Sequence, residues 1–274
     1  MEKPDAVIVD LDGTLLNTQR QCSPRNRQAL QRCRQMGIPV IIATSRSPRS
    51  IRQLLGAAFL HQYSHVVLNG ALAWAAAPFQ GRYQRPLGTP VALHIVEAVL
   101  RRHASVLITV EVDGERLVTN VPRHAPTLWQ HFLATPDMVI PFDALGEGHV
   151  LKIFVDGQHK DLRATGLWLQ TAFHDTILVV PAHQGTILNI MAADTTKERG
   201  VEAVLTPMGR TLSRAWVFGD DLPDLGMLRA AGVAVAMENA CQEVRTVAHH
   251  ITAHHEVDGV AQFLEPWLER WSVS

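Results

Sequence analysis

The chain of 274 residues carries 25 lysines and arginines against 26 aspartates and glutamates, so its formal net charge is −1. This balance argues against a positively charged surface that would attract nucleic acid or an anionic membrane, and we expect neither partner. Three widely spaced cysteines favour free thiols in a reducing compartment. Because we find neither a signal peptide nor an apolar run of membrane-spanning length, we expect a cytoplasmic protein, either a monomer or a homodimer.

The first predicted strand ends on two aspartates. Residues 6–9 are apolar and are followed by Asp10-Leu11-Asp12-Gly13-Thr14. Such a run is typical of a buried parallel strand, and open α/β sheets bind ligands at the C-terminal ends of their strands. Alternate residues of an extended chain point the same way, so Asp10 and Asp12 are expected to face one cation or substrate atom. Thr14 is expected to hydrogen-bond to the backbone in the turn that Gly13 permits.

Alternating helices and strands follow. Ser23-Pro24 predicts a helix N-terminus, as does Ser47-Pro48, and each helix precedes an apolar strand, over residues 38–44 and 65–71. Right-handed crossovers place the ends of parallel strands at one edge of the sheet. Thr44 is therefore expected at the same edge as Asp10.

The regular alternation then stops, and residues 83–183 are predicted to form a separate α+β lobe. Helical and strand patterns mix there with hairpin signals such as Asp113-Gly114, which favours an antiparallel sheet with helices on one face. The alternation is expected to resume from residue 187. Residues 1–82 and 184–274 are accordingly predicted to form one doubly wound, parallel-sheet core.

A second group of carboxylates follows the strand predicted at residues 215–218, in Gly219-Asp220-Asp221-Leu222-Pro223-Asp224. Five aspartates are thus expected near one crevice: Asp10, Asp12, Asp220, Asp221 and Asp224. Like charges about 4 Å apart repel by roughly 4 kcal/mol at an effective dielectric near 20, so a cation is expected. An all-oxygen set favours Mg²⁺, which shares its shell with substrate phosphate. Lys197 and Thr44 supply an ammonium and a hydroxyl for that phosphate.

These segments resemble, in order and context, the four motifs of the haloacid dehalogenase superfamily. Further stretches are similar to Cof-type sugar-phosphate phosphatases with a type IIB cap: Ala43-Thr44-Ser45-Arg46, Leu68-Asn69-Gly70-Ala71, residues 233–240 and Asp258-Gly259-Val260. The resemblance covers residues 1–82 and 184–274. It implies a Rossmann-like core in which the inserted lobe, residues 83–183, is a cap that selects the substrate.

The resemblance also implies an activity, the Mg²⁺-dependent hydrolysis of small phosphate monoesters, such as sugar phosphates, through an aspartyl-phosphate. Asp10 would be the nucleophile, and Asp12 would protonate the leaving group and then activate water. The metal would be held by Asp10, the Asp12 backbone carbonyl and Asp220, with Asp221 or Asp224 in support. Phosphate or the leaving group would be contacted by the remaining site residues: Leu11, Thr44, Ser45, Arg46, Lys197 and Asn239.

Three residues depart from the family pattern, Ser45, Pro223 and Glu238, which stand where the family usually has Gly, Asn and Gly. Two alternatives stay open: a phosphomannomutase-like phosphotransferase, and a phospho-acceptor or binding protein with little turnover. The histidine pairs at residues 249–250 and 254–255 match no zinc-site spacing, so we expect them on a solvated surface.

Overall fold

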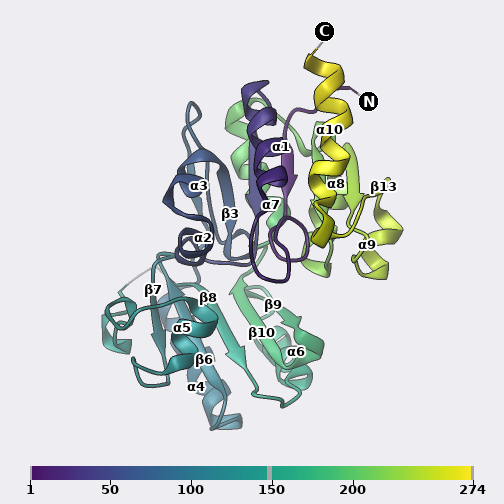
Figure 1. Ribbon diagram of the computed structural model, residues 1–274. Helices are drawn as coiled ribbons and strands as arrows, with labels where there is room; N and C mark the ends of the chain where they lie inside the picture. Colours follow the sequence, from purple (N-terminus) through teal and green to yellow (C-terminus); the bar gives the residue numbers. More distant parts are fainter. Residues whose placement is uncertain (1, 147–149, 273–274) are drawn as a thin grey trace. The chain divides into compact units, whose positions relative to one another are not determined.

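The computed structural model describes residues 2–146 and 150–272, which divide into two compact units (Figure 1). Unit 1 comprises residues 2–46, 51–83 and 196–272, and unit 2 comprises residues 47–50 and 84–195. The sequence analysis predicts an inserted lobe over residues 83–183, but Tyr83 belongs to unit 1 and unit 2 continues to Thr195. The reason is strand β10 (Ile187–Ala192), which pairs antiparallel with two strands of unit 2 instead of joining the parallel core.

Unit 1 contains an eight-stranded sheet in the order β13-β12-β11-β1-β2-β3-β4-β5. Strands β13 to β3 are parallel, and β4 runs antiparallel to β3. Central strand β1 pairs with β2 on one side and β11 on the other, so the chain winds outward in both directions from this point. In such sheets the ligand crevice lies at this switch point. The strands are β1 (Val7–Val9), β2 (Val40–Ala43), β3 (Ser64–Val67), β4 (Leu72–Trp74), β5 (Arg82–Gln84), β11 (Trp216–Gly219), β12 (Val233–Ala236) and β13 (His250–Ile251).

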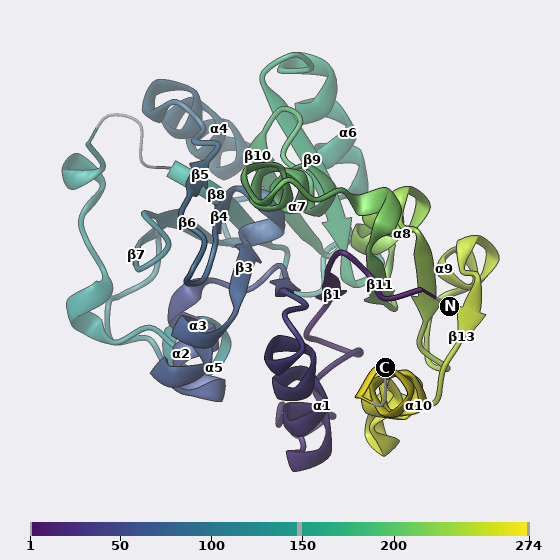
Figure 2. The same cartoon turned by 90° about the horizontal axis from the view of Figure 1, so that it is seen from above.

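Helices cover both faces of this sheet (Figure 2). On one face, Ile8 and Val217 belong to a core shared with α7 and α8; on the other, Trp216 packs edge-on against Phe263 of α10, with ring centroids 5.6 Å apart. The Ser23 side chain accepts a hydrogen bond from the Asn26 amide, as expected for an N-cap before proline. The helices of this unit are α1 (Pro24–Gln35), α2 (Pro48–Leu55, whose residues 48–50 belong to unit 2), α3 (Ala57–Gln62), α7 (Lys197–Leu205), α8 (Leu225–Ala230), α9 (Gln242–Val247) and α10 (Gly259–Ser272).

Unit 2 is built on a five-stranded antiparallel sheet in the order β7-β6-β8-β10-β9. Its strands are β6 (Leu107–Val112), β7 (Arg116–Thr119), β8 (Val150–Asp156), β9 (Ile177–Ala182) and β10. Helices α4 (Thr89–Arg102) and α6 (Arg163–Ala172) pack on one face, and α5 (Pro126–Phe132) contributes to a smaller second cluster. The predicted hairpin turn is present, since Asp113 and Gly114 both have positive φ.

The predicted fold class, a doubly wound α/β core with an inserted α+β unit, is confirmed. Within residues 2–146 and 150–272, no helix is both long enough and apolar enough to cross a membrane. A cytoplasmic location stays a prediction.

Candidate active site

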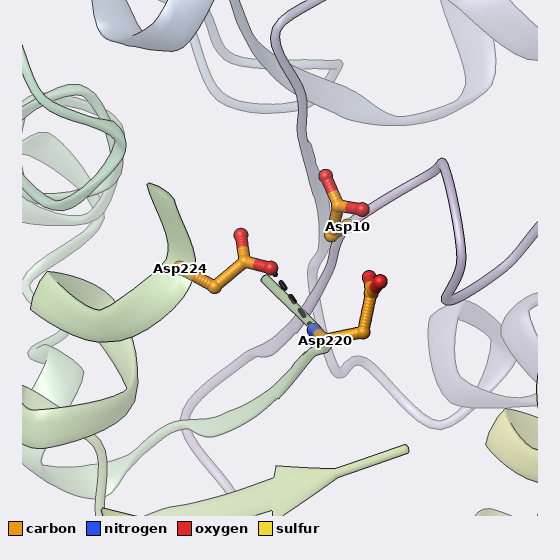
Figure 3. Close-up of side chains that lie close together, drawn as sticks. All are labelled: Asp10, Asp220 and Asp224. Carbon is orange, nitrogen blue, oxygen red and sulfur yellow. Dashed lines mark hydrogen bonds between the residues drawn. The ribbon is translucent and has the colours of Figure 1, made fainter. Parts of the chain in front are cut away.

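Three carboxylates converge at the C-terminal ends of β1 and β11 (Figure 3). Each of Asp10, Asp220 and Asp224 offers an oxygen, and these atoms lie within 4.8 Å of one another. Asp10 follows β1 directly, and Asp220 follows β11. Asp224 is held by two backbone amides, because its Oδ2 accepts hydrogen bonds from Asp220 at 3.0 Å and Asp221 at 3.3 Å. The loop after β11 thus folds back on itself and presents a buried carboxylate.

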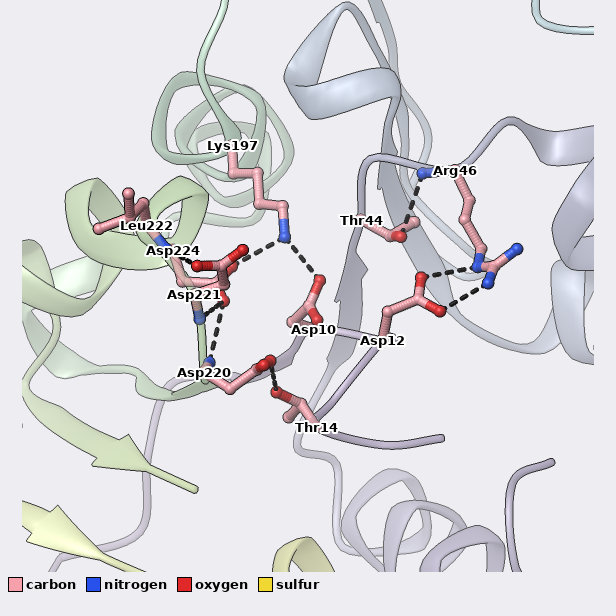
Figure 4. Close-up of polar contacts among 10 residues, drawn as sticks. All are labelled: Asp10, Asp12, Thr14, Thr44, Arg46, Lys197, Asp220, Asp221, Leu222 and Asp224. Carbon is pink, nitrogen blue, oxygen red and sulfur yellow. Dashed lines mark hydrogen bonds and ion pairs between the residues drawn. The ribbon is translucent and has the colours of Figure 1, made fainter. Parts of the chain in front are cut away.

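Lys197 lies between two of these carboxylates (Figure 4). Its Nζ donates to Asp10 Oδ1 at 2.5 Å and to Asp224 Oδ1 at 2.8 Å, and all three side chains are buried. The lysine is the first residue of α7, whose N-cap Thr196 accepts a hydrogen bond from the Arg199 amide. A cation at a helix N-terminus is unfavourable unless negative charge is close by, and here two carboxylates supply that charge.

Burial and crowding change the protonation of the whole cluster. Burial raises the pKa of Asp10 well above its usual range, and the negative charges of Asp224 and Asp220 add to the effect, although Lys197 opposes it. Burial, together with Asp224, also raises the pKa of Asp220 to about 7. Burial by itself would lower the pKa of Lys197, but its two carboxylate partners outweigh it and the pKa is raised. The cluster therefore has more buried carboxylates than one ammonium can neutralise.

This donor set fits Mg²⁺. Three carboxylates supply oxygen ligands of the kind that hard divalent cations prefer. Burial raises the pKa of Asp220, and a cation beside it would favour the ionised form of this carboxylate. Asp10, Asp220 and Asp224 are therefore the described residues that would hold the ion.

Asp12 does not join this group. Its carboxylate forms a two-point ion pair with Arg46, whose Nε and Nη2 donate at 2.7 and 2.5 Å, and its side chain is 46% exposed. A shared direction for Asp10 and Asp12 requires an extended chain between them, but β1 ends at Val9 and the chain turns. The two-residue alternation of a strand therefore no longer sets the direction of Asp12. Its backbone carbonyl as a metal ligand stays a prediction.

Asp221 also lies outside the cluster. Its side chain is exposed and accepts a hydrogen bond from the Leu222 amide, so it caps the short 3₁₀ helix Leu222–Asp224. Of the two candidates for the supporting position, the structure thus places Asp224 in the cluster. Pro223 is at the start of this 3₁₀ helix, a position that tolerates the missing amide hydrogen.

The sequence predicts a local backbone contact for Thr14, but its hydroxyl instead donates to Asp220 Oδ1 at 2.7 Å. The signal that could have suggested this is its position after the first motif, at the sheet edge to which β11 also delivers its carboxylate. Thr44 is buried, and its Oγ1 accepts from the Arg46 amide at 3.2 Å. The Leu11 side chain is fully buried, so only the backbone of that residue could meet a substrate. Contacts of Leu11, Thr44 and Ser45 with phosphate stay predictions.

The side chain of Asn239 forms two hydrogen bonds to the backbone of the protein. Its Nδ2 donates to the Gly13 carbonyl at 2.8 Å, and its Oδ1 accepts from the His255 amide at 3.2 Å. This geometry favours a role in holding the loop after β1 over the predicted contact with phosphate. The expectation of a solvated surface is wrong for His255, whose side chain is only 11% exposed and whose Nδ1 donates to the Leu16 carbonyl at 2.7 Å.

Comparison with known proteins shows the family to which the chain belongs. A 5-amino-6-(5-phospho-D-ribitylamino)uracil phosphatase of Bacillus subtilis is 27% identical over 279 residues, spanning 97% of this chain and 98% of the relative. A pyridoxal phosphate phosphatase of Escherichia coli is 25% identical, spanning 94% and 96%. The crystal structure of a haloacid dehalogenase-like hydrolase from Bacteroides thetaiotaomicron has the same fold, with a TM-score of 0.80, 23% identity and coverage of 96% of this chain and 99% of that one. The family model described as haloacid dehalogenase-like hydrolase matches residues 7–264, and the chain therefore belongs to that family.

Proposed function

We propose that this protein is a phosphatase that hydrolyses small phosphate monoesters. The observation that carries the proposal is the convergence of Asp10, Asp220 and Asp224 on one side of the Lys197 ammonium. Three carboxylates beside a single lysine leave negative charge without a partner, which costs stability unless a cation is bound. Membership of a hydrolase family and relatives named as phosphatases support phosphate as the group transferred.

Asp10 is the proposed nucleophile. One of its oxygens attacks phosphorus, the bond from phosphorus to the ester oxygen breaks, and an aspartyl-phosphate forms. Lys197 already contacts Asp10 Oδ1, so its ammonium lies beside the reacting carboxylate and can hold the transferred phosphoryl oxygens. The Thr44 hydroxyl is proposed to donate a further hydrogen bond to these oxygens.

Asp12 is the proposed acid and base. In the first step its protonated form would give a proton to the leaving alkoxide, and in the second its carboxylate would take a proton from the water that cleaves the aspartyl-phosphate. Its pairing with Arg46 places a guanidinium beside this carboxylate in the absence of substrate. Arg46 would then be released to contact the leaving group.

Mg²⁺ bound at Asp10, Asp220 and Asp224 would neutralise the cluster and polarise a phosphoryl oxygen. Removal of divalent cations is therefore expected to abolish turnover. The same carboxylates without a cation would repel the incoming phosphate dianion.

The substrate is proposed to be a phosphorylated metabolite such as a sugar phosphate. Both named relatives act, by their names, on small phosphorylated metabolites, 5-amino-6-(5-phospho-D-ribitylamino)uracil and pyridoxal phosphate. Unit 2 interrupts the chain between Thr44 and Lys197, and we assign it the selection of the leaving group.

The test is phosphate release from a panel of phosphate monoesters in the presence of Mg²⁺. The panel contains hexose 1- and 6-phosphates, pyridoxal 5′-phosphate and 5-amino-6-(5-phospho-D-ribitylamino)uracil. Asp10→Asn and a chelator control are run beside the wild type, with Asp175→Asn as the matched control because that carboxylate is exposed in unit 2. We expect turnover in the wild type and Asp175→Asn, and loss in Asp10→Asn and after chelation.

Other outcomes separate the alternatives. Conversion of hexose 1-phosphate to hexose 6-phosphate without free phosphate would identify a phosphomutase. A phosphorylated wild-type protein that persists for hours would identify a phospho-acceptor. Equal turnover by the wild type and Asp10→Asn would rule out Asp10 as the nucleophile.

A further inference from the structure

The loop that follows β1 is held from outside by two segments far along the chain. At Gly13 and Leu16 the backbone carbonyls accept hydrogen bonds from the side chains of Asn239 and His255. Because a carbonyl only accepts, the His255 Nδ1 must carry the proton. The amide of Thr18 donates to Glu256. Three separate points of residues 13–18 are thus fixed.

Asn239 and His255 are also hydrogen-bonded to each other. The His255 amide donates to Asn239 Oδ1 at 3.2 Å, so the segment after β12 and the 3₁₀ helix His255–Val257 form one unit against the loop. Arg245 adds a hydrogen bond to the Glu238 carbonyl, next to Asn239. These hydrogen bonds therefore form one connected network, in which the position of each residue depends on the others.

Thr14 lies in the chain between the hydrogen-bonded carbonyls of Gly13 and Leu16, and it contacts the carboxylate cluster. Its hydroxyl donates to Asp220 Oδ1 at 2.7 Å. The neighbouring Gly13 leaves room for this carboxylate, since a Cβ at that position would be 2.3 Å from Asp220 Oδ2. Both oxygens of Asp220 thus face a loop whose backbone is held by Asn239 and His255.

We propose that Asn239 and His255 are positioning residues for the metal ligand Asp220, acting through the loop at residues 13–16. The inference rests on the metal site of the proposed function. It assigns a role to His255, whose spacing matches no zinc site. It also assigns one to Asn239, whose side chain hydrogen-bonds to the backbone of the protein. Residues that orient metal ligands typically change metal affinity about 10- to 100-fold when removed.

The test measures Mn²⁺ binding to the full-length protein, by electron paramagnetic resonance of the free ion. The variants are His255→Phe, which keeps the ring but removes the donor, and Asn239→Leu, which keeps the size but removes the amide. His250→Phe is the matched control, because that histidine is exposed on β13 and its ring packs against Phe263 rather than bonding to the loop. We expect the Kd for Mn²⁺ to rise about tenfold in both variants and to stay unchanged in the control.

Two further measurements separate positioning from a general loss of structure. Thr14→Val should weaken Mn²⁺ binding like the two variants, whereas Thr14→Ser, which retains a hydroxyl, should restore it. The double variant of Asn239 and His255 should lose little more affinity than either single one, because both act through one loop. Saturating Mn²⁺ should return any turnover toward the wild-type value.

The inference is overturned if His255→Phe and Asn239→Leu bind Mn²⁺ as tightly as the wild type, or if Thr14→Val does. A wild type that binds no Mn²⁺ overturns both this inference and the metal site of the proposed function. Weakened binding in the variants of a protein that hydrolyses no ester on the panel supports this inference while it contradicts the proposed activity.

Discussion

At the scale of single residues, the Lys197 ammonium stabilises the carboxylate cluster when no metal is bound, because it pairs with Asp10 and Asp224. Removal of its ammonium leaves buried carboxylates without a partner, which typically costs about 3–5 kcal/mol. We expect Lys197→Met to lower the free energy of unfolding of the metal-free protein by about that amount, measured by urea denaturation with a chelator. Lys160→Met, which changes an exposed lysine, is the control and should stay within about 0.5 kcal/mol. Equal unfolding midpoints for the two variants would contradict this prediction.

Asp220 should make the stability of the metal-free protein depend on pH. Its pKa is about 7 in the folded protein, mainly through burial, while an unfolded aspartate titrates near pH 4. Between those values the folded state binds more protons, so the contribution of Asp220 to the free energy of unfolding falls as pH rises, by at most about 1.4 kcal/mol per pH unit.

Asp220→Asn cannot titrate, which isolates this contribution. The free energy of unfolding of the variant, minus that of the wild type, should increase as pH rises from about 4 to about 7 and then level off. Urea denaturation across that range, with a chelator present, measures the difference. A difference that stays constant or shrinks with pH would show that Asp220 is ionised throughout.

At the scale of elements, the packing of α7 against the β3–β4 hairpin depends on Gly200. A Cβ at this position would lie 2.4 Å from Cγ1 of Val66 and 3.1 Å from the Gly70 Cα. We expect Gly200→Ala to lower the free energy of unfolding by about 1–3 kcal/mol, because the helix must move. Since α7 begins at Lys197, the same movement should reduce kcat.

A double-mutant cycle checks this contact. Val66→Ala removes the methyl that the new Cβ would strike, so the double variant should lose less stability than the sum of the single changes, with a coupling of at least about 0.5 kcal/mol. Gly88→Ala is the control, because open space surrounds a Cβ at that position. Strict additivity of the two changes would show that the helix accommodates alanine without the clash.

Most elements of the core and part of the site follow from local sequence patterns. Apolar strands that end on polar residues predict a parallel sheet with those residues at one edge, which is why Asp10 and Asp220 meet as expected. Side-chain direction is harder to predict once a strand has ended. Asp12 turns to Arg46 because the chain leaves the extended conformation at Asp10, and no residue pattern marks that point.

Long-range pairing explains the remaining differences. An apolar run such as residues 187–192 fits a parallel or an antiparallel strand equally well, so the sequence does not assign β10 to unit 2. The contacts of Asn239 and His255 with the loop after β1 join residues more than 200 positions apart. Neither residue type nor spacing identifies such a partner.

At the scale of the whole molecule, the two units have separate hydrophobic cores, and the carboxylate cluster belongs to unit 1. A ligand that binds only the native site stabilises the cooperative unit that contains it. Mg²⁺ should therefore slow backbone hydrogen exchange in unit 1, most strongly around β1, β11 and the start of α7. Exchange in β6 and β8 of unit 2 should be unchanged.

Hydrogen exchange followed by mass spectrometry, with and without Mg²⁺, tests this on the intact chain. Asp220→Asn is the control, because a variant that lacks one of the three carboxylates should show weaker protection of the same peptides. Equal protection of β8 and β1 by Mg²⁺ would mean that the two units open together, or that a second metal site lies in unit 2. The same variant separates these two cases. Loss of protection in both β1 and β8 of Asp220→Asn would indicate one metal site and joint opening of the units. Protection of β8 that survives the substitution would indicate a metal site in unit 2.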